Sequence, residues 1–149
     1  MSSGRLTHAL IRSLDWLAEC TLPAEKLPGH QRTGRRGEED AYFYLRRGGY
    51  VMVARNFRSP HRRGEIDLIG WDKDVLCFIE VKTRTTRAVK PAEAAVDREK
   101  QRALIAVASD YLRHVVPSCQ WRFDVISVYY DSQSSQPQFE SFQNAFPLA

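Results

Sequence analysis

Three scarcities narrow the kinds of protein that this sequence of 149 residues can be. Its three cysteines, Cys20, Cys77 and Cys119, are widely spaced and form no CxxC pair, which argues for a reducing compartment rather than a disulfide scaffold. No segment approaches the roughly 20 apolar residues that a membrane helix needs. The four histidines are scattered, without metal-ligand spacing. We therefore expect a cytoplasmic protein with no membrane contact.

Acidic residues are missing from two stretches, residues 41–64 and residues 81–92. The first stretch holds six arginines, although the net charge of the whole chain is only +4. This arrangement suits a polyanionic partner such as nucleic acid, while a solvated basic surface is the simpler alternative. The candidate phosphate-binding side chains are Arg55, Arg58, Arg62, Arg63, Arg84 and Lys100.

Residues 65–82 carry the most informative pattern of the chain, two apolar and β-branched segments joined by turn residues. We predict a hairpin in which Lys73 and Asp74 form a two-residue loop and Asp72 pairs with Val75. Side chains alternate between the two faces of a strand, so this register fixes which residues share a face.

Four charged side chains share one face of this hairpin. Asp67 falls across from Glu80, and Glu65, whose role stays open, falls across from Lys82 as a candidate partner. Three carboxylates and an ammonium group would meet there, which suggests a metal site because solubility alone does not require them. The opposite face is predicted to hold Ile66, Leu68, Cys77, Ile79 and Val81.

These acids suit a hard divalent cation, Mg²⁺ or Mn²⁺. Mg²⁺ is usually held by one or two carboxylates and completes its shell with water and substrate phosphate oxygens. Asp67 and Glu80 can supply the carboxylates, and the main-chain carbonyl of Val81 can add a neutral ligand. Lys82 is expected to stay protonated beside them and to orient a water molecule or stabilise a phosphate in the transition state.

The start of the chain is predicted to be separate from the rest. Residues 6–20 place leucines at helical spacing, and this amphipathic helix docks either on its own domain or on a partner protein. Residues 21–34 contain two prolines and two glycines and are predicted to be a linker. We therefore expect an N-terminal extension, residues 1–32, and one domain, residues 33–149.

Two further helices are predicted, at residues 34–47 and from Pro91 to Val115. Glu38 lies on the apolar stripe of the first helix, where it is either solvated at the helix end or directed at a partner. Lys100 lies on the stripe of the second, and its ammonium group either extends to solvent or reaches the carboxylates. The order helix, three strands, helix, strand predicts an α/β fold with a central mixed sheet flanked by helices. The other predicted strands are residues 50–58, 121–130 and 139–142.

These residues match a known pattern. Asp67, followed by Glu80, Val81 and Lys82, resembles the D…(D/E)xK signature of restriction-endonuclease-like nucleases, and the element order resembles the core of that superfamily. More closely, residues 33–130 resemble the YraN family of bacterial proteins, which is related to archaeal Holliday-junction resolvases. The matching segments are Gly37-Glu38, Ala41, Leu45, Gly49-Tyr50, Arg55-Asn56, residues 64–69, residues 78–84 and residues 122–125.

The resemblance implies metal ligation by Asp67 and Glu80, a catalytic role for Lys82, and completion of the site by Glu38. Asp124 also matches the family, with a structural ion pair as the alternative.

The implied function is a metal-dependent endonuclease that cleaves DNA, with branched or structured DNA as one candidate substrate. The alternative is a catalytically silent nucleic-acid-binding module in a DNA repair or processing assembly. Resolvases act as symmetric dimers, so a homodimer is one arrangement, although no pattern marks its interface.

Overall fold

The computed structural model describes residues 29–85, 96–115 and 118–146. The predicted helix at residues 6–20, most of the predicted linker and Pro91 lie outside these residues. The described elements are α2 (Gly29–Arg47), β1 (Val51–Phe57), β2 (Ile66–Asp72), β3 (Val75–Arg84), α3 (Arg98–Leu112), β4 (Gln120–Tyr129) and β5 (Gln138–Phe142).

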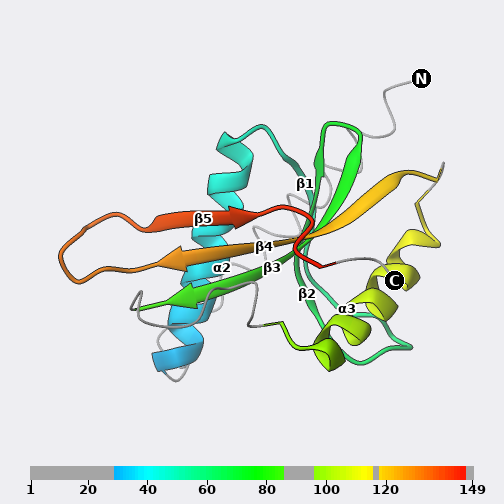
Figure 1. The fold of residues 1–149 in the computed structure, drawn as a ribbon, viewed down its shortest axis with the longest axis horizontal. Helices are drawn as coiled ribbons and strands as arrows, with labels where there is room; N and C mark the ends of the chain where they lie inside the picture. The colour runs from blue at the N-terminus through cyan, green and yellow to red at the C-terminus, as the bar shows by residue number, and fades with distance from the viewer. Residues whose placement is uncertain (1–28, 86–95, 116–117, 147–149) are drawn as a thin grey trace.

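The five strands form one mixed sheet in the order β1-β2-β3-β4-β5 (Figure 1). β1, β2 and β3 pair antiparallel, β3 and β4 pair parallel, and β5 pairs antiparallel with β4. A parallel pair needs a crossover connection, and α3 lies in the connection between β3 and β4. The predicted fold class is confirmed, and the arrangement is consistent with a restriction-endonuclease-like core.

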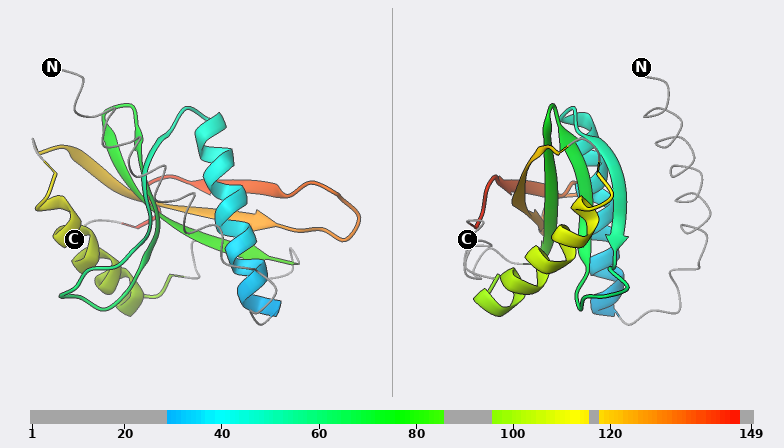
Figure 2. Two further views of the ribbon diagram at one scale, coloured as in Figure 1. Left: turned by 180° about the vertical axis from the view of Figure 1, so that it is seen from behind. Right: turned by 90° about the vertical axis from the view of Figure 1, so that its right-hand side faces the viewer.

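The two helices cover opposite faces of the sheet (Figure 2). On the α2 side, the predicted stripe of Ala41, Tyr42 and Leu45 is buried against β2, β3 and β4. On the α3 side, a second cluster includes Ile66, which was predicted on the other face. The regular alternation fails between Leu68 and Ile66, where the pairing of β2 with β3 has ended and Ile66 pairs only with Phe57 of β1.

α2 ends at Arg47 as predicted, because Gly49 takes a left-handed φ of 93° that terminates the helix. Its start differs from the prediction, since residues 29–34 are helical and do not form a linker. The proline at position 28 was interpreted as a break, but proline also suits the positions where a helix begins. The predicted domain boundary at residues 32 and 33 stays a prediction.

α3 begins at Arg98, seven residues after the predicted start. Asp97 is its N-cap, and the carboxylate accepts a hydrogen bond from the main-chain N–H of Lys100 at 2.8 Å. This cap places Lys100 in the first turn of the helix, where α3 lies beside the end of the sheet. Neither described helix is long and apolar enough to span a membrane.

Candidate metal centre

Two of the acids, Asp67 and Glu80, lie at the open end of the β2–β3 hairpin. β2 and β3 pair around the predicted two-residue loop as far as Leu68 and Ile79, and the next residues are Asp67 and Glu80. There the main-chain N–H of Val81 donates to Oδ2 of Asp67 at 2.8 Å. This hydrogen bond fixes the Asp67 carboxylate at the end of the sheet beside Glu80.

Glu80 is the most buried acid of this cluster, with a side chain that is 4% exposed. Its Oε1 accepts from Nζ of Lys82 at 2.8 Å and also from Nζ of Lys100. Of the two alternatives for Lys100, the structure therefore has the one in which it reaches the carboxylates. Oε2 of Glu80 is buried and has no hydrogen-bond partner among the described residues. A buried carboxylate oxygen without a donor is unfavourable, and a cation would satisfy it.

Glu38 reaches the acidic cluster from α2, and the Asn56 side chain bridges Glu38 and Glu65. With its NH₂ group turned toward the acids, the Asn56 amide donates to Oε1 of Glu65 at 3.0 Å and to Oε2 of Glu38 at 3.1 Å. Asparagine tolerates the left-handed conformation that this position requires. The sequence pattern did not single out Asn56 as a site residue. It lies between Arg55 and Phe57, which pair with Leu68 and Ile66, so only the β1–β2 register of the structure brings it to the level of Asp67.

Glu65 does not pair with Lys82, its candidate partner across the hairpin. Nε and Nη2 of Arg58 both contact Oε2 of Glu65, whereas Lys82 binds Glu80. Arg58 lies in the segment that follows β1, and that segment brings it back to the start of β2. The ion pair engages Arg58 at the edge of the acidic cluster, although most of its side chain is exposed.

Burial and the crowding of charges shift the pKa values of three groups in the cluster. Burial, reinforced by the charge of Glu80, raises the pKa of Asp67 well above its ordinary value. Burial and the charge of Glu65 likewise raise the pKa of Glu38. Burial opposes the charged form of Lys100, but the hydrogen bond and the charge of Glu80 outweigh it and raise the pKa. The acids thus lie in an environment that favours an additional cation.

The donors fit a divalent cation whose shell is completed by other oxygens. Among the described residues, no three His, Cys, Asp or Glu side chains form a group that could hold a metal ion. Asp67, Glu80 and the carbonyl of Val81 would form the partial shell typical of Mg²⁺, with water and phosphate oxygens supplying the rest. The buried Oε2 of Glu80 fits this role because it lacks another partner within the described part of the chain.

The arginines predicted to bind phosphate occupy different places. Arg55 is half-buried on β1, where its guanidinium lies 5.2 Å from the centre of the Tyr42 ring and its charge opposes the raised pKa of Glu38. Arg62 and Arg63 are exposed between β1 and β2. Arg84 is half-buried at the end of β3. The structure therefore brings Arg55 to the acids and leaves Arg62 and Arg63 on the surface.

Asp124 takes part in a structural network near the hairpin loop, whereas the acidic cluster lies at the hairpin's open end. Its buried carboxylate accepts from Nε of Arg122 at 2.9 and 3.1 Å and from the main-chain N–H of Asn144 at 2.9 Å. Arg122 also donates to Asp72 at 2.9 Å and to the Tyr50 hydroxyl at 3.1 Å. This geometry matches the structural alternative for Asp124.

Fold and site together define a class, a mixed α/β protein with carboxylates and lysines gathered at the end of its central sheet. The chain belongs to the Uncharacterised protein family UPF0102, whose family model matches residues 37–128. The predicted resemblance to the YraN family is thereby confirmed.

Relatives in several bacteria match most of the chain. A UPF0102 protein of Koribacter versatilis is 50% identical over 143 residues, which are 96% of this chain and 96% of the relative. One from Solibacter usitatus is 43% identical over 116 residues, 76% of this chain and 84% of the relative. One from Porphyromonas gingivalis is 40% identical over 119 residues, 80% and 87% of the two chains. The Koribacter match covers 96% of this chain and so includes most of residues 1–32, whereas the family model begins at residue 37.

Proposed function

We propose that this protein is a metal-dependent endonuclease that hydrolyses phosphodiester bonds in DNA with Mg²⁺ or Mn²⁺. The observation that carries the proposal is the arrangement at Glu80, where one oxygen receives two lysines and the other is buried without a described partner. With Asp67 beside it, this arrangement offers ligands for a cation and ammonium groups for a phosphate. Branched or structured DNA is the candidate substrate, from the resemblance to resolvases.

Each side chain has a role in the proposed reaction. Asp67, Glu80 and the carbonyl of Val81 would hold the ion, which when bound lowers the pKa of water and neutralises charge on the phosphate. Lys82 bonds to Glu80 and keeps 20% of its side chain exposed. From there its ammonium group can orient the attacking water or stabilise charge that develops on the phosphate. Glu38 completes the set of acids from α2.

A panel of DNA substrates tests the proposal. Single-stranded, duplex, flapped and four-way DNA are incubated with the full chain and Mn²⁺, and the wild type is compared with Glu80→Ala and Glu80→Gln. We expect the wild type to cleave at least one substrate and both variants to lose about 100-fold or more in rate. No cleavage of any substrate, or cleavage that survives Glu80→Ala, would contradict the proposal.

A matched pair of variants on α2 tests the contribution of Glu38. Glu38 faces the acidic cluster, whereas the adjacent Glu39 is exposed. We expect Glu38→Gln to slow cleavage and Glu39→Gln to leave it unchanged, since only the first acid belongs to the site. Equal rates for the two variants would remove Glu38 from the proposed mechanism.

A catalytically silent nucleic-acid-binding module is the second candidate, favoured by the contacts of Lys82 and Lys100 with Glu80. Two ammonium groups on one carboxylate already balance its charge without a metal ion. This candidate predicts salt-dependent binding without turnover, unaffected or improved in Asp67→Asn and Glu80→Gln. Loss of binding in those variants would count against it.

DNA as the partner, a homodimer, a protein partner for residues 6–20 and a cytoplasmic location stay proposals. Light scattering of the full chain, alone and with four-way DNA, measures whether a dimer forms. A variant without residues 1–28, compared with the full chain for recovery of bound proteins, measures the contribution of the N-terminal segment.

A further inference from the structure

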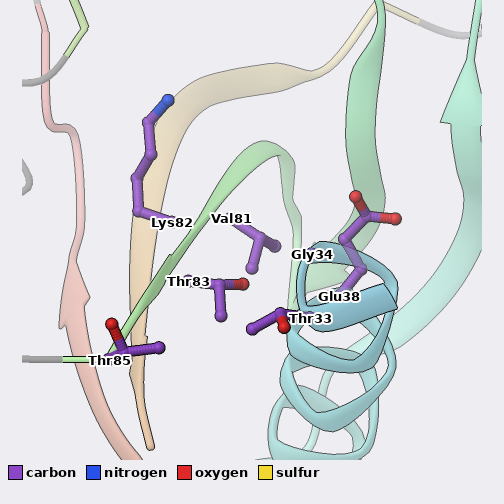
Figure 3. A pocket seen from close by; sticks show the side chains of 7 residues that line it. All are labelled: Thr33, Gly34, Glu38, Val81, Lys82, Thr83 and Thr85. Atoms are coloured by element: carbon purple, nitrogen blue, oxygen red, sulfur yellow. The ribbon is translucent and has the colours of Figure 1, made fainter. Parts of the chain in front are cut away.

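A cavity of about 380 Å³ opens between the first half of α2 and the end of β3 (Figure 3). This volume lies within the range of small-molecule sites. Glu38 and Lys82 line the cavity and also belong to the acidic cluster, so the two sites adjoin. Gly34 forms part of the wall contributed by α2.

Three of the seven described residues that line this cavity are threonines. Thr83 and Thr85 lie two positions apart at the end of β3, and Thr33 lies across from them on α2 (Figure 3). The Thr33 hydroxyl donates to the carbonyl oxygen of Gly29 at 3.0 Å and keeps its capacity to accept. The hydroxyls of Thr83 and Thr85 make no hydrogen bond to another described residue. The cavity therefore presents several polar groups that can bind a ligand.

We infer that this cavity is a subsite for one nucleotide of the bound strand, next to the phosphate that is cleaved. The inference rests on the proposed function and identifies where that strand would lie. Threonine hydroxyls commonly contact phosphate and sugar oxygens. The ammonium group of Lys82 points away from these threonines (Figure 3) and bonds to Glu80, so it would meet the adjoining phosphate of the strand rather than the nucleotide in the cavity. An apolar ligand would leave these polar groups without partners, because Val81 is the only aliphatic side chain among the described lining residues.

Gly34 allows the cavity to be filled without disturbing the fold. A Cβ added at Gly34 would meet nothing within 4 Å, and the same is true at Gly29 on the same helix. Leucine at either position replaces a poor helix former with a good one. Only Gly34 lines the cavity, so Gly34→Leu fills it and Gly29→Leu serves as the matched control.

Binding without cleavage is the main measurement. A fluorescently labelled single-stranded oligonucleotide is titrated with the full chain in EDTA, and a cleavage-resistant phosphorothioate strand is titrated with Mn²⁺ present. We expect Gly34→Leu to bind about tenfold more weakly than wild type and Gly29→Leu to bind equally well. Equal binding by Gly34→Leu and wild type in both titrations, or no binding by wild type in either, overturns the inference.

A second pair of variants tests the hydroxyl chemistry. Thr85→Val keeps the shape of the side chain but removes the hydroxyl, whereas Thr85→Ser keeps the hydroxyl. We expect weaker binding by the first variant and binding close to wild type by the second. If both variants bind alike, the hydroxyl makes no contact with the strand and the assigned chemistry is wrong.

Cleavage measured in parallel separates this inference from the proposed function. If the wild type binds without cleaving and Gly34→Leu binds weakly, the subsite stands and the nuclease proposal fails. If the wild type cleaves and Gly34→Leu cleaves with the same kcat and KM, the nuclease proposal stands and the subsite is wrong.

Discussion

Gly37 sets the distance between α2 and β3, and a larger residue there should push the two elements apart. The residue is buried, and an added Cβ would lie 3.1 Å from Cβ and 3.2 Å from Cγ2 of Thr83, and closer still to its Oγ1. These separations are shorter than van der Waals contact allows. Because Glu38 follows Gly37 directly, a shift of α2 would also move this acid relative to the cluster.

The magnitude follows from comparison with a second glycine of the same helix. Overpacking typically costs about 1–3 kcal/mol, while alanine stabilises a helix by about 1 kcal/mol relative to glycine. Gly34→Ala gains only the second contribution, because nothing lies within 4 Å of its added Cβ. The difference in the free energy of unfolding between Gly34→Ala and Gly37→Ala should therefore equal the steric cost, about 1–3 kcal/mol.

Urea unfolding followed by circular dichroism measures this difference. Adding Thr83→Ala to Gly37→Ala removes two of the three clashing atoms, and the double-mutant cycle should give a coupling energy of about 1 kcal/mol or more. If Gly37→Ala and Gly34→Ala unfold at the same urea concentration, α2 and β3 are not in close contact at this point and the reasoning is refuted.

Three further predictions concern the polar network, the buried thiol and the metal. Arg122→Ala should lower the free energy of unfolding by about 3 kcal/mol, because it leaves the buried Asp124 carboxylate without its ion pair. In the same urea titration, loss of the exposed pair in Arg58→Ala should cost less than about 1 kcal/mol, and equal costs would contradict the argument. Burial raises the pKa of Cys77 to about 12, so peptide mass spectrometry should find alkylation of this thiol only after unfolding. Mn²⁺ should raise the melting temperature of the wild type but not of Asp67→Asn, and equal shifts would argue against Asp67 as a ligand.

The register of the hairpin could be predicted because it depends on a two-residue loop and a strict period of two. For that reason Asp67 and Glu80 were expected to lie side by side. In the structure each of them is the next residue of its strand beyond the last pair, Leu68 and Ile79. The sequence left two alternatives open for Lys100, and it could not decide between solvent and the contact with Glu80. That contact depends on how α3 crosses the sheet, which no local pattern of residues determines.

Competition between side chains for the same partner is the second reason why part of the site could not be predicted from the sequence. The strand register predicts Lys82 as the partner of Glu65. It says nothing about Arg58, which lies in an irregular segment after β1 and binds Glu65 instead. Asn56 was equally hidden, because its role depends on a left-handed backbone conformation within a strand that looks regular in sequence. The strand register was therefore enough to predict which acids lie together, whereas predicting their partners would have required knowing the path of the irregular segments.

The charge balance of the cluster should couple metal binding to substrate binding. In the structure the lysines already neutralise Glu80, so a divalent cation that enters alone meets two ammonium groups on its ligand. A phosphate that arrives with the cation gives those ammonium groups an alternative partner. Mn²⁺ should therefore bind more tightly with cleavage-resistant DNA than without it, and by linkage the DNA should bind more tightly with Mn²⁺. Calorimetric titration measures both affinities, and equal Mn²⁺ affinity with and without DNA would show that the lysines and the metal do not compete.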